Sequence, residues 1–520
     1  MIPKVPSVPE EQRTDAVVEL LEIIRVQQET IQHLRDEIAR LKGQKPKPDI
    51  KPSKLEQGRT KEGDANAKKR PGSAKRSKTK ELPIHETKKI RPEGIPRGSR
   101  FKGYRDYVVQ DIIIKVHTTN YRLECWQTLE NGYLIGKLPE CVTGHFGPTL
   151  VTYMLYQYYH AHVTQPLLRE QLLEFGVEIS SGQVNRIITE GKERFHAEKE
   201  AILKAGLEVS GYINVDDTNA RHEGRNGYCT YIGNQSFAWF QSTESKSRRN
   251  FLELLRTGYA DYVINAEAIQ YMATQGLPGP QVANYAAGGA VSFESLQQWE
   301  EHLHASAITD ERHIRIATEA ALLGSMLAHG FNRELVIVSD DAGQFNVLMH
   351  ALCWVHAERT INKLVGFNDQ QKEALEEIRC RIWDLYGELK DYKKFPDKEK
   401  KVQLEKRFDE LYTSRTCFAS LNLALKRLHT NKSELLLVLE RPDIPLHNNT
   451  SENDLRDYVK KRKISGSTRS GPGRRCRDTF TSLKKTCRKH GVSFWEYLKD
   501  RVTGQNVIAR LPDLIRSQTS

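Results

Sequence analysis

The sequence predicts a multidomain α/β protein, and three observations lead to that class. The chain has 520 residues, which is more than one ordinary domain holds. Between about residues 209 and 505, short β-branched apolar runs alternate with charged helical segments. Two of those runs, Tyr212–Val215 and Leu335–Val338, each end in a pair of aspartates. These features indicate one large α/β core with smaller modules attached to it.

Composition excludes several classes of protein. Charged residues make up 28% of the chain and hydrophobic residues 38%, which is typical of a globular protein with some linker. The sequence contains no run of about 18 apolar residues and does not start with a basic-then-apolar signal pattern, so we expect no membrane contact and a cytoplasmic location. The eight cysteines form no C-x-x-C pair, which argues against a disulfide framework and a zinc ribbon.

Positive charge is concentrated in two regions. Residues 42–100 contain 19 Lys and Arg against 7 Asp and Glu, and residues 447–490 contain 13 against 4. The segment between them is net acidic, at about −7. Two basic regions beside an acidic body suit a polyanion held next to a carboxylate site, because phosphate contacts dominate nucleic-acid affinity. For residues 42–100 alone, a solvated disordered tail explains the charge equally well.

The amino-terminal 100 residues predict two modules. Residues 1–42 contain an amphipathic helix with seven apolar residues at eight heptad positions, namely Val17, Leu20, Ile24, Gln27, Ile31, Leu34, Ile38 and Leu41. This pattern favours a parallel coiled coil and hence a homo-oligomer, the alternative being a helix packed on the chain's own body. Residues 43–100 are rich in Lys, Pro, Gly and Ser and predict a flexible basic linker.

Residues 101–208 predict a small β-subdomain followed by a helical region. Residues 101–140 have β-type patterning with an Asn131-Gly132 turn signal. Residues 141–208 are helical, and two helices separated by Gly176, the second capped by Ser180 or Ser181, have the outline of a helix-turn-helix. We expect either DNA recognition by the second helix or an ordinary helical hairpin.

The aspartate pairs point to a metal site. A carboxylate at the end of a strand projects into the crevice at the sheet edge, where ligands of α/β sheets bind. Carboxylates there suit hard divalent cations such as Mg²⁺. Adjacent strand residues face opposite sides, so only one aspartate of each pair can point at the metal. A solvated turn would explain either pair alone.

A third carboxylate and a basic track lie in the second basic region. Thr450 or Ser451 can cap a helix whose first turn carries Glu452. The same helix is then rich in Lys and Arg, and the residues expected to neutralise DNA phosphates are Arg456, Lys460, Arg462 and Lys463. One helix can thus offer a carboxylate to metal and cations to phosphates.

These blocks resemble one family of enzymes. The segments VDDT, DDA followed by LCWVHAER, and NNTSENDLRDYVKKRK followed by SGSTRSGPGRR are similar to successive blocks of the insertion-sequence 66 transposase family, over about residues 140–505. The resemblance implies a ribonuclease-H-like catalytic core of DDE type that binds two Mg²⁺ or Mn²⁺ ions. It assigns the catalytic and metal-binding roles to Asp216, Asp340 and Glu452. In the family's C-x-x-H motif the matching residues are Cys353 and His356, with Trp354 between them.

The resemblance also sets the expected layout. The core would comprise residues 209–352 and 447–505, interrupted by a helical insertion at 353–446 and followed by a tail at 506–520. We interpret Cys353, Trp354 and His356 as structural residues at the root of that insertion, since no further soft ligands are visible nearby. Residues 266–330 are longer than the family pattern, and Cys125 and Cys141 are too few for the zinc module of many members.

The resulting hypothesis is a bacterial DNA transposase that cuts transposon ends, joins them to target DNA and associates with the nucleoid when bound to DNA. Two other functions remain open. One is a catalytically inactive DNA-binding regulator derived from a transposase. The other is a ribonuclease-H-like nuclease without transposition activity. The partners expected in the first case are transposon ends, target DNA and a second copy of the chain.

Overall fold

The computed structural model describes residues 83–142 and 144–518. The chain divides into two compact units, Met1–Ile113 and Ile114–Ser520. The expected coiled coil and most of the expected basic linker lie outside the described residues. Within the first unit, residues 83–113 run without helix or strand and are exposed, and Phe101 and Tyr104 form an edge-to-face ring pair with centroids 5.0 Å apart.

The second unit begins with a small hairpin. Strands β1 (Cys125–Gln127) and β2 (Tyr133–Ile135) pair antiparallel around a turn in which Asn131 has a positive φ of 60°. Within residues 101–140, whose patterning predicts a small β-subdomain, residues 101–124 contain no strand. An isolated strand leaves its backbone groups unpaired, and only the segment with the Asn131-Gly132 turn folds back on itself.

Four helices precede the main sheet. They are α2 (Pro148–Tyr159), α3 (Gln165–Glu174), α4 (Ser181–Thr189) and α5 (Glu193–Val209). Gly176 follows α3 with a φ of 86°, and the Ser180 hydroxyl caps α4 by accepting from the Gln183 N–H at 3.2 Å. The predicted two-helix outline with a serine cap is therefore confirmed as structure.

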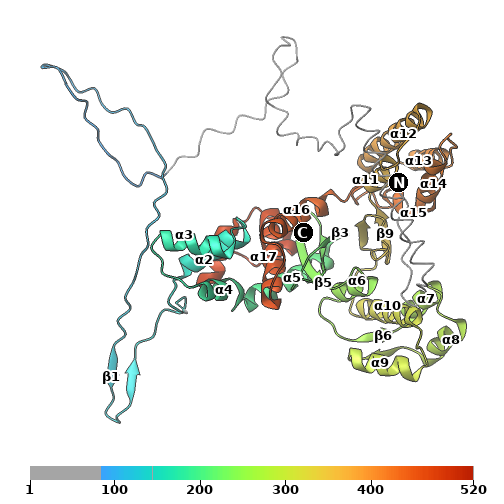
Figure 1. Cartoon of the computed structure of the whole chain (residues 1–520), viewed down its shortest axis with the longest axis horizontal. Coiled ribbons are helices and arrows are strands. Elements are labelled where there is room, and N and C mark those ends of the chain that lie inside the picture. Colours follow the sequence, from blue (N-terminus) through green and yellow to red (C-terminus); the bar gives the residue numbers. More distant parts are fainter. Residues whose placement is uncertain (1–82, 143, 519–520) are drawn as a thin grey trace, which may run out of the picture. The chain divides into compact units, whose positions relative to one another are not determined.

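The main sheet has five strands in the order β5-β4-β3-β8-β9. The strands are β3 (Tyr212–Asn219), β4 (Tyr228–Gly233), β5 (Ala238–Thr243), β8 (Val336–Ser339) and β9 (Met349–Leu352). The first three form an antiparallel meander, whereas β8 and β9 join β3 in parallel. The sheet is thus mixed, and β3 lies at its centre (Figure 1).

Strand β3 is longer than the apolar run that predicts it. It pairs with β8 only from Tyr212 to Asn214 but continues beside β4 as far as Asn219. The expectation that the strand ends at its aspartates is therefore wrong, because Asp216 and Asp217 lie inside β3. They sit just beyond the point where β8 stops pairing, so the hairpin projects past the parallel half of the sheet.

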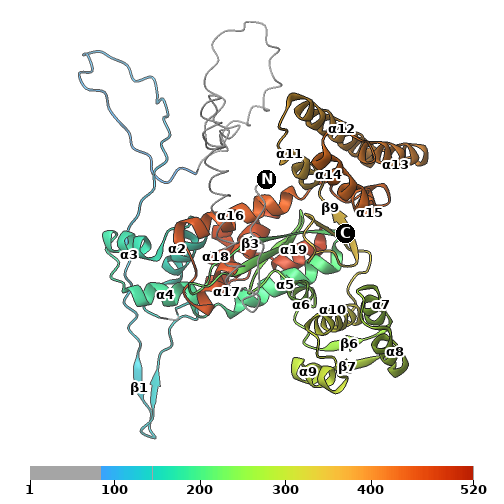
Figure 2. The ribbon, with the colours of Figure 1, turned by 45° about the vertical axis from the view of Figure 1, so that its right-hand side comes forward.

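Helices cover both faces of the sheet. Side chains of one face, including Ile213, Ile232 and Ile337, pack into a core shared with α5 and α10. On the other face, Tyr231 and Phe240 pack against α16 (Asn449–Ser465), and Val336 and Val338 pack against α11–α15. Figure 2 shows α16 and α5 on opposite sides of β3.

Two insertions interrupt the core. The first follows α6 (Arg248–Leu255) and contains β6 (Tyr262–Ile264), α7 (Ala266–Thr274), α8 (Gly279–Gly288), β7 (Val291–Phe293), α9 (Leu296–Ala305) and α10 (Glu311–Ala328). The second contains α11 (Trp354–Asn362), α12 (Asp369–Lys394), α13 (Lys398–Tyr412), α14 (Ala419–Thr430), α15 (Lys432–Leu435) and a short 3-10 helix at Leu437–Leu439. It leaves the sheet after β9 and returns at α16.

The carboxy-terminal helices α17 (Gly471–Lys489), α18 (Phe494–Thr503) and α19 (Leu511–Ser517) complete the core. Side chains of α17 reach the backbone of the outer strand β5. The Asp478 carboxylate and the Ser482 hydroxyl accept from the N–H groups of Ser242 and Phe240, at 2.7 and 2.9 Å. A helix thus satisfies backbone donors that a further strand would otherwise bind. Among the described residues, no helix is long and apolar enough to cross a membrane.

Candidate active site

The two aspartates of β3 have different surroundings. Asp217 accepts hydrogen bonds from the Thr230 hydroxyl at 2.6 Å and from the Gln344 amide at 3.0 Å. Asp216 accepts one from the backbone N–H of Asp217 at 2.7 Å, and no other partner of its carboxylate lies within the described residues. Alternation along the strand places Asp216 on the same face as Asn214, whose side chain contacts the start of α16.

The aspartates after β8 divide in the same way. Asp341 pairs with Arg427 of the helical insertion and accepts from Asn431 at 3.4 Å. Asp340 accepts from the backbone N–H of Ala342 at 3.2 Å, which fixes a tight turn and leaves part of its carboxylate free. In each acidic pair, side chains of the protein bind the second carboxylate, whereas the first accepts a hydrogen bond only from a backbone N–H among the described residues.

Glu452 lies in the first turn of α16, and the beginning of that helix is tied to β3. The predicted cap at Thr450 or Ser451 is wrong, because the helix begins after Asn448. The fully buried Asn448 side chain donates to the Val215 carbonyl and accepts from the Asn214 amide, both at 2.8 Å. It therefore serves β3 and does not cap its own helix.

Glu452 is held by an arginine of the helical insertion. Nη1 and Nη2 of Arg359 donate to the two carboxylate oxygens at 2.7 and 3.5 Å. Nε2 of His356 lies 3.5 Å from the same carboxylate and 3.1 Å from Arg359. A charge-assisted fork of this kind fixes the orientation of the carboxylate.

The charges of the other two expected carboxylates act on Asp216. Burial, and next the charge of Asp340, raise the pKa of Asp216 to about 7. The hydrogen bond from the Asp217 N–H opposes this rise, and the charges of the Asp217 and Glu452 carboxylates add to it. Burial alone would raise the pKa of Glu452, but the Arg359 fork outweighs it and the net shift is downward. The charges of Asp340 and Glu452 thus act on Asp216, while Arg359 neutralises Glu452 on the α16 side of the site.

The donor set suits a hard divalent cation. All three side chains offer oxygen, which Mg²⁺ and Mn²⁺ prefer. A buried aspartate whose ionisation is opposed by a second carboxylate is the kind of group that a cation would stabilise. Among the described residues, no group of three or more His, Cys, Asp or Glu side chains is arranged to hold a metal ion as they stand. The three side chains therefore fit a metal ion by their chemistry, although Arg359 is bound to the Glu452 carboxylate in this structure.

The C-x-x-H residues lie at the root of the helical insertion. Cys353 is buried, and its sulfur accepts from the Asn448 N–H at 3.2 Å. The Trp354 indole donates to the Leu435 carbonyl at 2.8 Å, which joins the two ends of the insertion. Burial, and next the charge of Arg359, lower the pKa of His356, while Asp340 and Glu452 act in the opposite direction.

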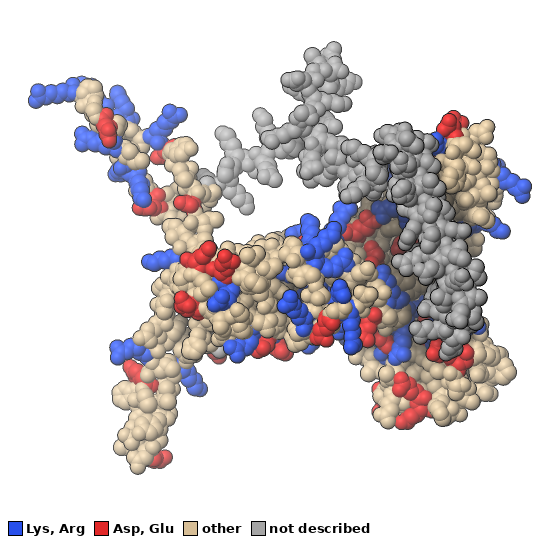
Figure 3. Space-filling view, in the orientation of Figure 1, with Lys and Arg blue, Asp and Glu red and all other residues tan. Residues whose placement is uncertain are grey.

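The expected phosphate-binding residues form a stripe on α16. Glu452, Arg456, Lys460 and Lys463 are spaced by four, four and three residues and share one face of the helix over about 16 Å. Arg456, Lys460 and Lys463 are exposed, and Figure 3 shows Lys and Arg side chains gathered over this helix. Arg462 lies off the stripe and donates to Thr218 at 3.3 Å and to the Asn219 carbonyl.

Four residues near the carboxylates were not anticipated from the sequence, namely Arg359, Asn448, Thr230 and Gln344. Arg359 carried one signal, since it stands three residues after His356 on a helix and so shares its face. Asn448 stands just before the Glu452 helix, but its partners on β3 are more than 230 residues away in sequence. No local pattern predicts such a contact.

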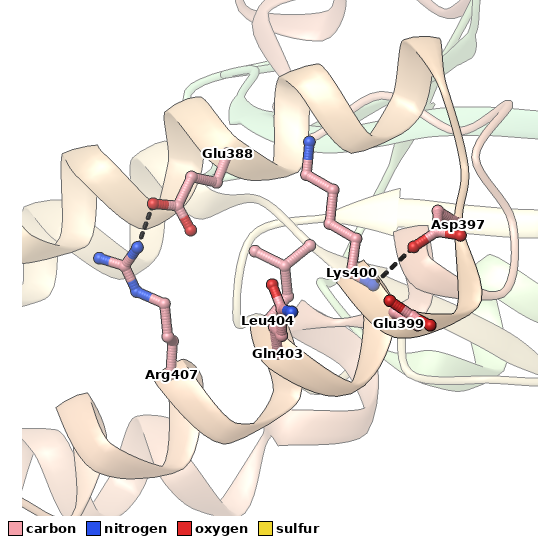
Figure 4. A pocket seen from close by; sticks show the side chains of 7 residues that line it. All are labelled: Glu388, Asp397, Glu399, Lys400, Gln403, Leu404 and Arg407. Carbon is pink, nitrogen blue, oxygen red and sulfur yellow. Dashed lines mark hydrogen bonds and ion pairs between the residues drawn. The ribbon is translucent and has the colours of Figure 1, made fainter.

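A hollow in the surface lies apart from the three carboxylates and has a different lining. It measures about 340 Å³ and lies between α12 and α13 (Figure 4). In it, Glu388 pairs with Arg407, and Asp397 caps α13 by accepting from the Lys400 N–H at 2.8 Å. Its lining comes from these two helices and the turn between them and includes no residue of β3. The Glu388 and Arg407 charges are paired, and the Asp397 carboxylate is occupied by the helix cap.

Comparison with known proteins places the chain in a family. Residues 320–475 match the Transposase IS66 family, a stretch that includes Asp340, His356, Arg359 and Glu452 but not Asp216. An uncharacterized protein of Sinorhizobium fredii (strain NBRC 101917 / NGR234), y4jO, is 46% identical over 303 residues, which is 58% of this chain and 94% of that protein. The chain belongs to the IS66 family of transposases.

Proposed function

We propose that this chain is a DNA transposase of the DDE type, which cuts DNA at transposon ends and joins the freed 3′ ends to target DNA. The observation that supports this most is the approach of Asp216, Asp340 and Glu452 from β3, β8 and α16 to one acidic point. The mixed central sheet, with an antiparallel meander on one side of β3 and parallel strands on the other, fits the ribonuclease-H-like core that the family resemblance implies.

In this proposal Asp216, Asp340 and Glu452 hold two divalent ions, Mg²⁺ or Mn²⁺. Such ions would activate the attacking hydroxyl and stabilise the leaving 3′ oxygen of the phosphodiester. The protein's own contribution is to keep the carboxylates in place. Asn448 fixes the start of α16 on β3, and Arg359 keeps Glu452 ionised and oriented.

The basic side chains of α16 would position the DNA. Arg456, Lys460 and Lys463 continue the face that carries Glu452, and Arg462 lies beside the end of β3. Contacts of this kind to backbone phosphates supply affinity and register without reading the sequence. We assign recognition of the transposon ends to α3–α4 and the β1–β2 hairpin.

Assembly and location follow from the same proposal. Two transposon ends must be brought together, and the heptad pattern at residues 1–42 offers a means of pairing two copies. The protein would act in the bacterial cytoplasm and associate with the nucleoid when bound to DNA.

The test is metal-dependent cleavage by the full-length chain. The substrate is DNA from the flanks of the coding region, where inverted repeats lie if the gene belongs to a mobile element. Glu452→Gln is expected to abolish Mg²⁺-dependent cleavage and leave DNA binding intact, because it removes a charged metal ligand without changing size. Glu373→Gln, at an exposed position of α12, is the matched control and keeps full activity. Full cleavage by Glu452→Gln contradicts the assignment.

A strand-transfer assay separates the alternatives. The substrate is a pre-cut end with a free 3′-OH, mixed with target DNA and Mg²⁺. A transposase gives joined product, a simple nuclease gives shortened DNA without joining, and an inactive regulator gives neither.

A further inference from the structure

A second basic site lies beside the carboxylates, at the tip of the β3–β4 hairpin. A hollow of about 480 Å³ is lined by three arginines, Arg221, Arg462 and Arg469, together with Gly224, Gly466 and Ser467. We call it the arginine pocket. Its lining contains no acidic residue. Among the residues described, none of the three arginines forms an ion pair with a carboxylate.

The walls of the pocket are held by backbone contacts between two loops. Thr468, after α16, donates its N–H to the Arg221 carbonyl at 3.2 Å and accepts at its own carbonyl from the Glu223 N–H at 2.9 Å. Its hydroxyl bonds to the His222 ring at 2.8 Å. The loop after α16 and the hairpin tip therefore form one unit, and the pocket is present before a ligand arrives.

Two glycines keep the pocket open. Gly224 and Gly466 have φ values of 78° and 69°, a region that residues with side chains rarely adopt, and a Cβ on either would meet no atom within 4 Å. Their role is thus conformational, and the absent side chains leave the backbone accessible to a ligand. Glycine at such points commonly permits a close approach of backbone to phosphate.

The arginine side chains have donors to spare. Arg221 uses Nε for the Gly224 carbonyl at 3.0 Å, and Arg462 uses Nη1 for Thr218 and Asn219. Arg469 forms no side-chain hydrogen bond or ion pair to any described residue. Three guanidinium groups in one hollow repel each other, and an anion with several oxygens relieves that repulsion while accepting their forks.

The position of the pocket relates it to the reaction. Arg462 touches Thr218, two residues beyond Asp216 on β3, and lies ten residues after Glu452 on α16, about 15 Å along the helix. At 3.4 Å per step of one DNA strand, that length corresponds to about four nucleotides. A strand with its scissile phosphate at the carboxylates therefore has other phosphates within reach of the pocket.

We infer that the arginine pocket binds the phosphodiester backbone of DNA a few nucleotides from the position of cleavage, with Arg221 and Arg469 as contacts additional to those of α16. This inference rests on the proposed function for its substrate. Because phosphates carry no base information, the pocket would add affinity and register for any DNA sequence.

The test measures binding without cleavage. Full-length protein is titrated in EDTA against a fluorescein-labelled DNA duplex of about 30 base pairs and arbitrary sequence, over a series of KCl concentrations. The Arg221→Ala/Arg469→Ala variant should bind more weakly, and the slope of log Kd against log salt should fall by about 1 to 2. The matched control is Arg315→Ala/Arg415→Ala, which removes two exposed arginines outside the pocket and should keep the wild-type slope.

Several outcomes overturn the inference. An unchanged slope in the pocket variant does so, as does an equal loss in the control variant. If the double variant does not fold, Arg469→Glu alone must weaken binding by reversing one charge at an exposed loop. Stabilisation of the wild type by inorganic phosphate at constant ionic strength, together with an unchanged DNA slope, would assign the pocket to free phosphate.

Failure of this inference differs from failure of the proposed function. If the wild-type protein cleaves and joins DNA while its pocket variants keep the wild-type salt slope, only the role of the arginine pocket is refuted. If the wild-type protein shows neither metal-dependent cleavage nor binding to duplex DNA, both the proposed function and the role of the pocket are refuted.

Discussion

Replacing Asp216 by asparagine should stabilise the metal-free protein. Burial and the neighbouring Asp340 raise the pKa of Asp216 from 3.8 to about 7, so the folded state favours the protonated carboxyl. Three pKa units correspond to about 4 kcal/mol of unfolding free energy. An acid with a raised pKa gives its full stability below about pH 4 and loses it as the pH rises to about 7. Asparagine keeps the acceptor for the Asp217 N–H but cannot ionise.

The assay is urea unfolding in EDTA between about pH 4 and pH 8. We expect Asp216→Asn to match the wild type at the acidic end and to exceed it by up to about 4 kcal/mol at the alkaline end. Added Mg²⁺ should stabilise the wild type at pH 8 and leave the variant unchanged, because binding to the folded state alone raises stability.

Asp217→Asn is the contrasting control. Burial raises the pKa of Asp217 as well, but its carboxylate accepts from Thr230 and Gln344, and an amide cannot accept both hydrogen bonds on its two polar atoms. Asp217→Asn should therefore cost stability at about pH 4 and gain less than Asp216→Asn at about pH 8. The reasoning is refuted if Asp216→Asn is no more stable than the wild type at about pH 8 in EDTA.

Two further predictions follow from contacts of the site, and a third follows from the heptad pattern of residues 1–42. Arg359→Ala should lower the maximal rate of cleavage, because Glu452 loses the guanidinium that orients it. It should also lower the Mg²⁺ concentration needed for half-maximal activity, because a cation that competes for Glu452 is removed. A Mg²⁺ titration of the cleavage rate measures both effects, and an unchanged titration curve contradicts the prediction. Asn448→Ala should lower the unfolding free energy by about 2–3 kcal/mol, since it leaves buried groups of β3 unpaired, whereas Asn453→Ala, at an exposed position of the same helix, should change it little in urea unfolding. Deleting residues 1–42 should convert an oligomer to a monomer in analytical ultracentrifugation, and identical sedimentation of the two chains argues against the coiled coil.

The sequence predicted the elements of the core better than their limits. Short β-branched apolar runs located β3 and β8, the glycine signal located the end of α3, and the serine signal located the start of α4. The end of β3 was misplaced because Asp216 and Asp217 look like turn residues, whereas each has a partner in β4 that keeps it in the strand. The β-type patterning before residue 125 gives no strand for the opposite reason, since no neighbouring segment pairs with residues 101–124.

The surroundings of the candidate site were less accessible to sequence reasoning. Which aspartate of each pair is free depends on Gln344 and Arg427, and both act across long separations in the chain. The arginine that holds Glu452 comes from another helix, 93 residues earlier. Such contacts depend on how distant segments of the chain come together, so local residue patterns do not predict them.

The way α17 lies along β5 has a consequence for how copies of this protein combine. An outer strand with unpaired backbone groups invites a strand from another molecule, which leads to extended sheets and aggregates. Here Ser482 and Asp478 already bind those donors, so a second protein cannot add to the sheet on this side without first displacing the helix. Copies of the protein that assemble on DNA must therefore contact one another through surfaces other than the outer edge of β5.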